Sequence, residues 1–229
     1  MKQVMNKYFA ELIGTFFLVL TIGCTVIGQG AGALAPLAIG SALMVMVFAG
    51  GHISGGHFNP AVTLGVWLRG KCDSKDVVPY MVFQIVGAVL AASVVSFLKQ
   101  GSAVTPLQPA TVPALVAEFL FTFALVYVVL NVATAKGTAG NSFYGLAIGF
   151  TVLIGAFSVG KISGGAFNPA VAVGISVMGL SSWSNLWIYV LADFAGGAVA
   201  AGAFKALNPA ERHDVRRPEA SDQKQKQAA

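Results

Sequence analysis

The chain has 229 residues, of which 56% are hydrophobic and only 10% are charged, with a formal net charge of +5. Soluble domains carry about 25% charged residues, so this composition excludes an ordinary soluble domain and indicates an integral membrane protein. The basic residues lie at the ends of apolar segments and in the C-terminal tail, where orientation signals belong, so no nucleic-acid partner is expected. Long apolar runs without period-2 alternation favour helices over a β-barrel.

In chain order, six full-length spans and two half-length apolar segments are predicted. The spans cover about residues 6–28, 34–51, 77–98, 114–135, 142–159 and 183–207. The half-length segments cover 59–68 and 168–178, and each makes about 15 Å of helix, half the thickness of a bilayer core. Residues 69–76 and 136–141 are expected to lie in water, 99–112 form a connection, and the polar residues 208–229 are expected to be a disordered cytoplasmic tail.

The first apolar run could imitate a cleaved leader. Lys2 and Lys7 precede it as in a signal peptide, and Cys24 weakly suggests a lipoprotein cleavage site. Glu11 interrupts the run, which is nevertheless long enough to span a bilayer, so a retained first helix is expected. Cys24 lies in an apolar run and Cys72 in a polar loop, so no disulfide, metal site or other cofactor is expected.

One stretch occurs twice and organises the rest of the chain. SGGHFNPAV at 54–62 returns as SGGAFNPAV at 163–171, and AELIGTF at 10–16 returns as AEFLFTF at 117–123. In each SGG box an Asn stands at the N-cap position and a Pro at the first helical position, so each box begins a half-length helix. Three full spans per half require opposite insertion, so the repeats over about 6–98 and 113–207 are inverted.

The charges predict the orientation. A cytoplasmic N-terminus leaves only Lys99 and Lys161 of the 14 basic residues outside. The positive-inside rule therefore places both termini in the cytoplasm. The short loops favour a multi-pass protein of a bacterial inner membrane.

Two half-helices that begin at mid-membrane bring two positive dipole ends together. Asn59 and Asn168 offer amide donors there, and the preceding glycines allow extended backbone whose carbonyls face a path. The sequence therefore predicts a narrow pore with acceptors along it, donors at its centre and a field that repels cations.

With these paired Asn-Pro-Ala boxes in inverted halves, residues 6–207 resemble an aquaporin of the major intrinsic protein family. The resemblance implies an all-α membrane protein, a right-handed bundle of six transmembrane helices plus two re-entrant half-helices in one channel domain over 1–207. It implies a homotetramer in the lipid bilayer that passes water and small uncharged solutes, while opposed half-helix dipoles exclude protons and ions, as is known for aquaporin-type pores. The implied pore boxes are Asn59, Pro60, Ala61, Asn168, Pro169 and Ala170. The implied pore carbonyls are those of Gly55, Gly56, His57, Phe58, Gly164, Gly165, Ala166 and Phe167.

The chain departs from the family at the selectivity filter. Water-selective members carry Arg directly after the second box, where this chain has Val171. Distances from the boxes place the other filter positions at Ile39, Ala156 and Gly165, so the predicted filter is apolar, uncharged and wide. Such a filter should admit larger or less polar neutral solutes, although Ala172 is not the Asp typical of glycerol facilitators. The preferred solute stays open, and the alternative is a broad facilitator of glycerol, urea, ammonia or hydrogen peroxide with water secondary.

Two acids lie inside predicted spans, where they are costly unless paired. The resemblance implies that Glu11 and Glu118 accept backbone N–H groups of the two re-entrant loops. Asp193, in the last span, is interpreted first as a hydrogen-bonded packing residue or subunit contact and second as a pore or gating residue.

Three further side chains have open roles. His52 and His57 lack neighbouring ligands and are expected to support the first loop rather than bind metal. Lys161 is either a solvated loop residue or a charge at the outer vestibule.

Rival functions are a coupled secondary transporter, which needs more polar residues at the broken helices, and a non-conducting structural membrane protein. An enzyme is not expected, because no nucleophile–base pair or metal set accompanies the boxes.

Overall fold

The computed structural model describes residues 2–28 and 30–211, which form eight α-helices, with the longest connection, 99–110, between the fourth and the fifth. The helices are α1 (Lys2–Val26), α2 (Ala35–Ser54), α3 (Pro60–Leu68), α4 (Ser74–Leu98), α5 (Thr111–Ala133), α6 (Tyr144–Ser163), α7 (Pro169–Val177) and α8 (Leu186–Leu207). Short 3-10 helices cover Gly32–Leu34, Lys136–Thr138, Trp183–Asn185 and Pro209–Glu211.

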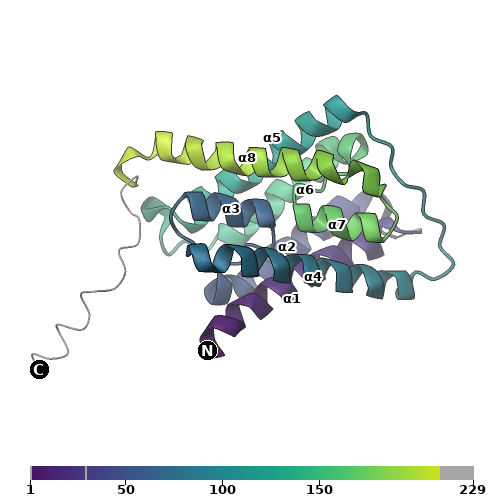
Figure 1. Cartoon of the computed structure of the whole chain (residues 1–229), viewed down its shortest axis with the longest axis horizontal. Helices are drawn as coiled ribbons and strands as arrows, with labels where there is room; N and C mark the ends of the chain where they lie inside the picture. The colour runs from purple at the N-terminus through teal and green to yellow at the C-terminus, as the bar shows by residue number, and fades with distance from the viewer. Residues whose placement is uncertain (1, 29, 212–229) are drawn as a thin grey trace, which may run out of the picture.

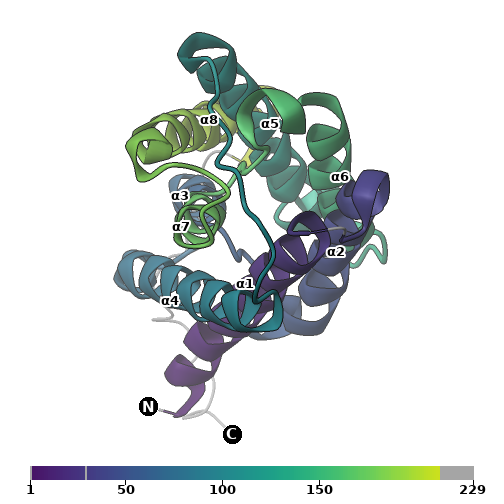
Figure 2. The same ribbon diagram turned by 90° about the vertical axis from the view of Figure 1, so that its right-hand side faces the viewer.

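Six of the described helices are long and apolar enough to cross a membrane, whereas α3 and α7 have nine residues each. The long helices run broadly along one direction, and α3 and α7 lie in line with each other between α4 and α8 (Figure 1). The view along the bundle places α7 in front of α3, with α8 on one side of them and α4 on the other (Figure 2). This is the predicted all-α arrangement of six spans and two half-length helices.

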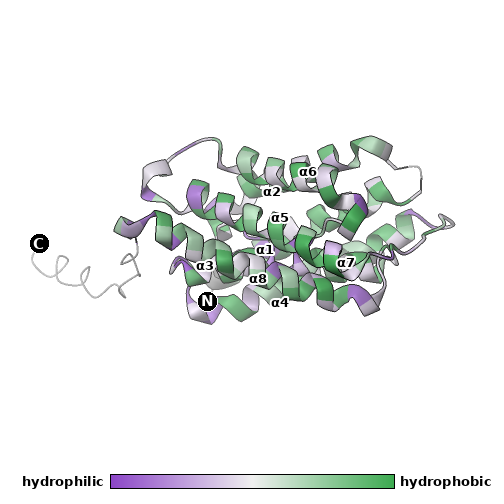
Figure 3. Cartoon of the chain, turned by 90° about the horizontal axis from the view of Figure 1, so that it is seen from above, coloured by the Kyte–Doolittle hydropathy of each residue, from purple (hydrophilic) through white to green (hydrophobic). Residues whose placement is uncertain are grey.

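The outer surface of the bundle is apolar. Green apolar residues dominate the helices, and many hydrophilic residues lie toward the ends of the bundle (Figure 3). On α1, Phe9, Ile13 and Phe17 recur every four residues and are 50%, 50% and 44% exposed, whereas Glu11 and Thr15 of the same helix are fully buried. This inverts the pattern of a soluble helix, because lipid surrounds the exposed face and the polar side chains find partners inside.

Glycines bring the helices close together at equivalent places in the two halves. A Cβ on Gly87 of α4 would lie 2.5 Å from the carbonyl oxygen of Leu12 on α1. A Cβ on Gly196 of α8 would lie 2.6 Å from the carbonyl oxygen of Phe119 on α5. Small residues permit this backbone approach in membrane helices, and the matching contacts show that the repeat extends to the packing.

Helices α2 and α6 continue beyond their predicted ends at residues 51 and 159. They end at Ser54 and Ser163, and each is capped by a left-handed glycine, Gly55 with φ 93° and Gly164 with φ 101°. The predicted ends therefore came too early, although Gly51 and Gly160 lie inside the two helices. A glycine inside a helix costs only about 1 kcal/mol, which tertiary packing readily offsets.

The predicted disordered tail begins too early. Pro209–Glu211 forms a 3-10 turn, and Glu211 pairs with Arg69 and accepts the backbone N–H of Lys136 at 2.9 Å. Arg69 is only 3% exposed, and its guanidinium lies 4.8 Å from the ring centre of Phe204. An ion pair and an aromatic face thus replace the water expected around Arg69. The remainder of the predicted tail, 212–229, lies outside the described residues.

Candidate functional site

The two Asn-Pro-Ala boxes begin the short helices as their residue types require. The Asn59 Oδ1 atom accepts the backbone N–H of Ala61 at 2.8 Å, and Asn168 Oδ1 accepts that of Ala170 at 2.9 Å. Each Asn is extended and each following proline occupies the first helical turn. The prolines and alanines of the boxes are buried inside the half-helices, so they shape the loops rather than line a cavity.

The asparagines also tie the two loops to each other. Asn59 Nδ2 donates to the carbonyl oxygen of Phe167 at 2.8 Å, and Asn168 Nδ2 donates to that of Phe58 at 2.9 Å. Both phenylalanines have φ 49° and are 1% exposed. A left-handed backbone at a non-glycine residue costs of order 1–3 kcal/mol. The reciprocal bonds and the buried rings hold both residues in this conformation.

Glu11 of α1 anchors the first loop. Its Oε1 accepts the Ser54 hydroxyl at 2.6 Å and the His57 N–H at 3.0 Å. Its Oε2 accepts the Phe58 N–H at 2.6 Å and the Gln84 amide at 2.7 Å. Four donors around one buried carboxylate satisfy its charge without a cation.

Glu118 of α5 makes the corresponding contacts with the second loop. It is fully buried and accepts the N–H groups of Ala166 at 3.0 Å and Phe167 at 2.6 Å. The Ser163 hydroxyl is a further partner. The carboxylates thus satisfy consecutive loop N–H groups that no helix pairs.

Two tyrosines complete the support, and sequence reasoning missed both of them. Tyr80 donates its hydroxyl to the Ser54 carbonyl and Tyr189 donates to the Ser163 carbonyl, each at 2.7 Å. Their separation of 109 residues equals that of the boxes. That shared offset is the sequence signal that could have revealed them.

One cavity of the bundle, named the outer cavity after the predicted orientation, has a volume of about 370 Å³. All four predicted filter residues, Ile39, Ala156, Gly165 and Val171, line it. Lys161 is the only charged residue among those that line it, and it projects from the last turn of α6 rather than from a loop. The cavity wall is therefore mainly apolar with one exposed cation.

The waist is a second cavity of about 20 Å³ between the two boxes, lined by both Asn59 and Asn168. A water molecule needs about 10–15 Å³ on this measure, so the waist has room for about one. Ile39, Gly165 and Val171 line both the waist and the outer cavity.

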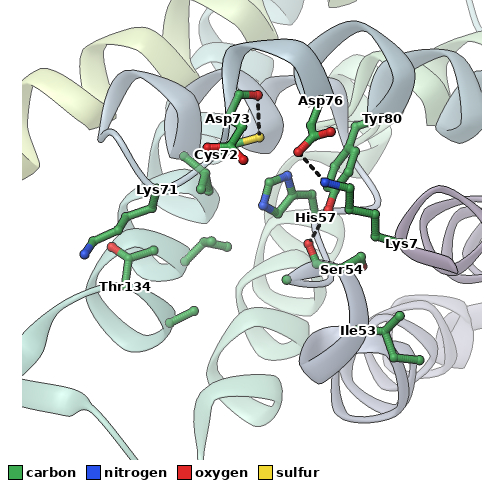
Figure 4. Close-up of a pocket in the computed structure, with 14 residues that line it drawn as sticks. Lys7, Ile53, Ser54, His57, Lys71, Cys72, Asp73, Asp76, Tyr80 and Thr134 are labelled. Atoms are coloured by element: carbon green, nitrogen blue, oxygen red, sulfur yellow. Dashed lines mark hydrogen bonds and ion pairs between the residues drawn. The ribbon is translucent and has the colours of Figure 1, made fainter. Parts of the chain in front are cut away.

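The inner cavity has a volume of about 470 Å³ (Figure 4). It adjoins the waist at the other end, since His57 and Val129 line both cavities. The three cavities therefore adjoin in sequence through the bundle.

Most of the residues whose carbonyls were predicted to line the pore lie along these three cavities. Gly55 and His57 line the inner cavity, His57, Phe58, Gly165 and Ala166 line the waist, and Gly164 and Gly165 line the outer cavity. Gly56 and Phe167 line none of the three. The Phe167 carbonyl is occupied by the Asn59 amide, and Gly56, with φ 63°, packs against the backbone of α2.

Polar side chains surround the inner cavity. Asp76 pairs with Lys7 and accepts the Tyr8 hydroxyl at 2.7 Å, so it is buried rather than in water as predicted. The His57 ring points into the cavity, and its Nδ1 lies 3.1 Å from Thr63 Oγ1 (Figure 4). His52, on the exposed last turn of α2, lies apart and lines a neighbouring open cavity.

The Cys72 thiol also lines the inner cavity. Burial, with a smaller contribution from Asp76, raises the pKa of Cys72 to about 11. The thiol therefore stays neutral at physiological pH and adds no charge to the path. No cluster of three or more His, Cys, Asp and Glu side chains suited to a metal occurs within residues 2–28 and 30–211.

Comparison with known proteins identifies the family. A profile described as Major intrinsic protein matches residues 1–204. The chain belongs to the major intrinsic protein family. As a member of that family it is a multi-pass membrane protein and a passive channel for water and small solutes.

Relatives of this channel occur in bacteria and plants. The glycerol uptake facilitator protein-like 6 of Lactiplantibacillus plantarum is 39% identical over 86% of this chain and 95% of its own length. Aquaporin NIP1-4 of Oryza sativa subsp. japonica is 38% identical over 89% of this chain and 77% of its own length. The X-ray structure of the aquaglyceroporin from Plasmodium falciparum superposes with a TM-score of 0.76 at 23% identity, covering 91% of this chain and 98% of that chain. That likeness shows a shared fold.

Proposed function

We propose that water and small uncharged solutes cross this channel through the outer cavity, the waist and the inner cavity in turn. The convergence of both box asparagines on one narrow waist carries the proposal. A waist with room for about one water forces solutes into single file. The chain acts as a channel rather than an enzyme.

The proposed selectivity filter is the ring of Ile39, Ala156, Gly165 and Val171. Support comes from their common position around the outer cavity, next to the waist. None of the four carries a charge or a side-chain donor, so a solute must leave part of its hydration shell there without replacement. The filter should therefore admit neutral solutes larger and less polar than water, the class to which glycerol belongs, in addition to water.

Proton and cation exclusion is assigned to the two half-helix starts. The N-termini of α3 and α7 each carry a partial positive charge, and the box asparagines keep both starts at the waist. With no Arg in the filter, this central field supplies most of the barrier, and Lys161 adds a cation at the outer cavity.

The proposed setting is a homotetramer with both termini in the cytoplasm of a bacterial cell. The family resemblance supports the tetramer, and the distribution of basic residues supports the orientation.

Val171→Arg tests the filter. Arg would fill part of the outer cavity and restore a fixed charge, so flux of glycerol and urea should fall about tenfold, or ~1.4 kcal/mol of barrier, and water flux less. Stopped-flow light scattering on proteoliposomes measures both fluxes. Val171→Leu is the control that adds bulk without charge. Equal loss of both fluxes, or no loss, would refute the filter assignment.

A further inference from the structure

The two re-entrant loops share a glutamate anchor but differ in the side chain beside it. In the first half, Gln84 of α4 donates its amide to Glu11 at 2.7 Å and to Thr63 at 3.0 Å. The equivalent position in the second half, 109 residues later, is Asp193 of α8. An ionised Asp has no hydrogen to donate, so it cannot replace the amide in that form.

Asp193 lies against the other anchor. Both Asp193 and Glu118 are fully buried, and each carboxyl group interacts with the other. Thr122 donates to Asp193 Oδ1 at 2.9 Å, and the backbone N–H of Asn168 is a further partner of this carboxyl group. The buried Oδ2 makes no hydrogen bond of normal geometry among the described residues. Two carboxyl groups this close in a buried site cannot both ionise readily. A single proton between them turns a repulsive contact into a hydrogen bond.

Within residues 2–28 and 30–211, no cation acts on this pair. The helices packed against α8 are α5, α3 and α7, and neither α3 nor α7 contains a titratable or charged side chain. Glu118 is the group of α5 that faces Asp193. On α8 itself, Tyr189 lies one turn away, and its hydroxyl donates to the Ser163 carbonyl. Lys205, twelve residues further along α8, is about 18 Å away along the helix axis.

We propose that Asp193 is a neutral carboxylic acid that shares one proton with Glu118 and anchors the second loop as Gln84 anchors the first. The pair then carries one negative charge instead of two. Glu118 in turn holds the N–H groups of Ala166 and Phe167. Asp193 touches no solute and is a positioning residue for the waist.

Infrared spectroscopy of the full chain in an ester-free detergent tests the shared proton. A protonated carboxylic acid has a carbonyl stretching band that is separate from the carboxylate bands. At neutral pH the unaltered chain should show such a band, shifted by ¹³C labelling of Asp carboxyls, of Glu carboxyls, or partly by each. Asp193→Asn should remove it while water permeability is kept, because the Asn amide can donate to Glu118. No band in the unaltered chain, or a band that persists in Asp193→Asn, would overturn the proposal.

The inverted repeat offers a matched control. Gln84→Glu places the same kind of acid pair beside Glu11 in the first half. The geometry predicts a second protonated-carboxyl band in this variant. Failure to gain that band would show that such a site tolerates two negative charges, which contradicts the argument.

A pH profile separates positioning from simple packing. Alkaline pH strips the shared proton, so water permeability and thermal stability of the unaltered chain should fall reversibly there. Asp193→Asn should stay flat over the same range, since its amide cannot ionise. Superimposable profiles of the two proteins would exclude the positioning role.

Discussion

The Phe58 ring packs directly against Gly14, so the substitution Gly14→Ala tests how the first loop is held. A Cβ on Gly14 of α1 would lie 2.2 Å from Phe58 Cε1, and a Cβ on Gly50 of α2 would lie 3.0 Å from Phe58 Cζ. Phe58 is 1% exposed, and glycines of α1 and α2 lie against its ring. The added methyl group must therefore displace the loop or the helix.

Two opposing effects determine how Gly14→Ala changes the free energy of unfolding. Ala in place of Gly inside a helix gains about 1 kcal/mol, whereas overpacking a dense core costs about 1–3 kcal/mol. Carbon atoms in contact normally lie about 3.5–4.0 Å apart. The 2.2 Å contact is much shorter, so we expect the overpacking cost to lie toward the upper end of its range. Displacing Phe58 also strains the bond from Asn168 to its carbonyl, worth about 0.5–1.5 kcal/mol. We expect a net loss of about 1–3 kcal/mol and a lower water permeability.

Thermal unfolding in detergent and stopped-flow light scattering on proteoliposomes measure the two quantities. Gly202→Ala in α8 is the matched control, because a Cβ there meets no atom within 4 Å. It should be neutral or stabilising, with normal permeability. Gly155→Ala, whose Cβ would lie 2.6 Å from Phe167 Cε2, should behave like Gly14→Ala. If Gly14→Ala matched Gly202→Ala in both assays, the steric reasoning would be refuted.

Two other perturbations have defined outcomes. Glu11→Gln leaves one acceptor oxygen for four donors and should lose at least two charge-assisted hydrogen bonds, about 1.5–3 kcal/mol each. Thermal unfolding in detergent measures this loss, and an unchanged midpoint would contradict the anchoring role. Arg69→Met removes the buried partner of Glu211 at a cost of about 3–5 kcal/mol, and limited proteolysis near residues 208–211 should accelerate relative to the unaltered chain.

Features governed by local chemistry could be predicted from the sequence. Each half-helix begins at its Asn because the side chain caps the first N–H groups and Pro fits the first turn. The acids inside the spans required partners, and Glu11 has four of them. Ile39 and Val171, which the family resemblance gives as filter positions, line the same cavity.

Features that depend on distant partners could not be predicted. Arg69 reads as a loop cation, yet Glu211 lies 142 residues away and withdraws it from water. The left-handed backbone of Phe58 and Phe167 is likewise not encoded by their own side chains. It follows from reciprocal bonds between the two halves, which local propensity does not register.

The remaining differences between the halves give the two sides of the waist different chemistry. On the inner side His57 bonds Thr63, whereas the equivalent positions of the second half are Ala166 and Ala172. A solute on the inner side therefore meets polar side chains up to the waist, but on the outer side it must cross an apolar ring first. If this ring is the filter, as proposed above, dehydration is concentrated there, and solute size and polarity are selected at the same place. Because transport is passive, this one barrier limits flux equally in both directions.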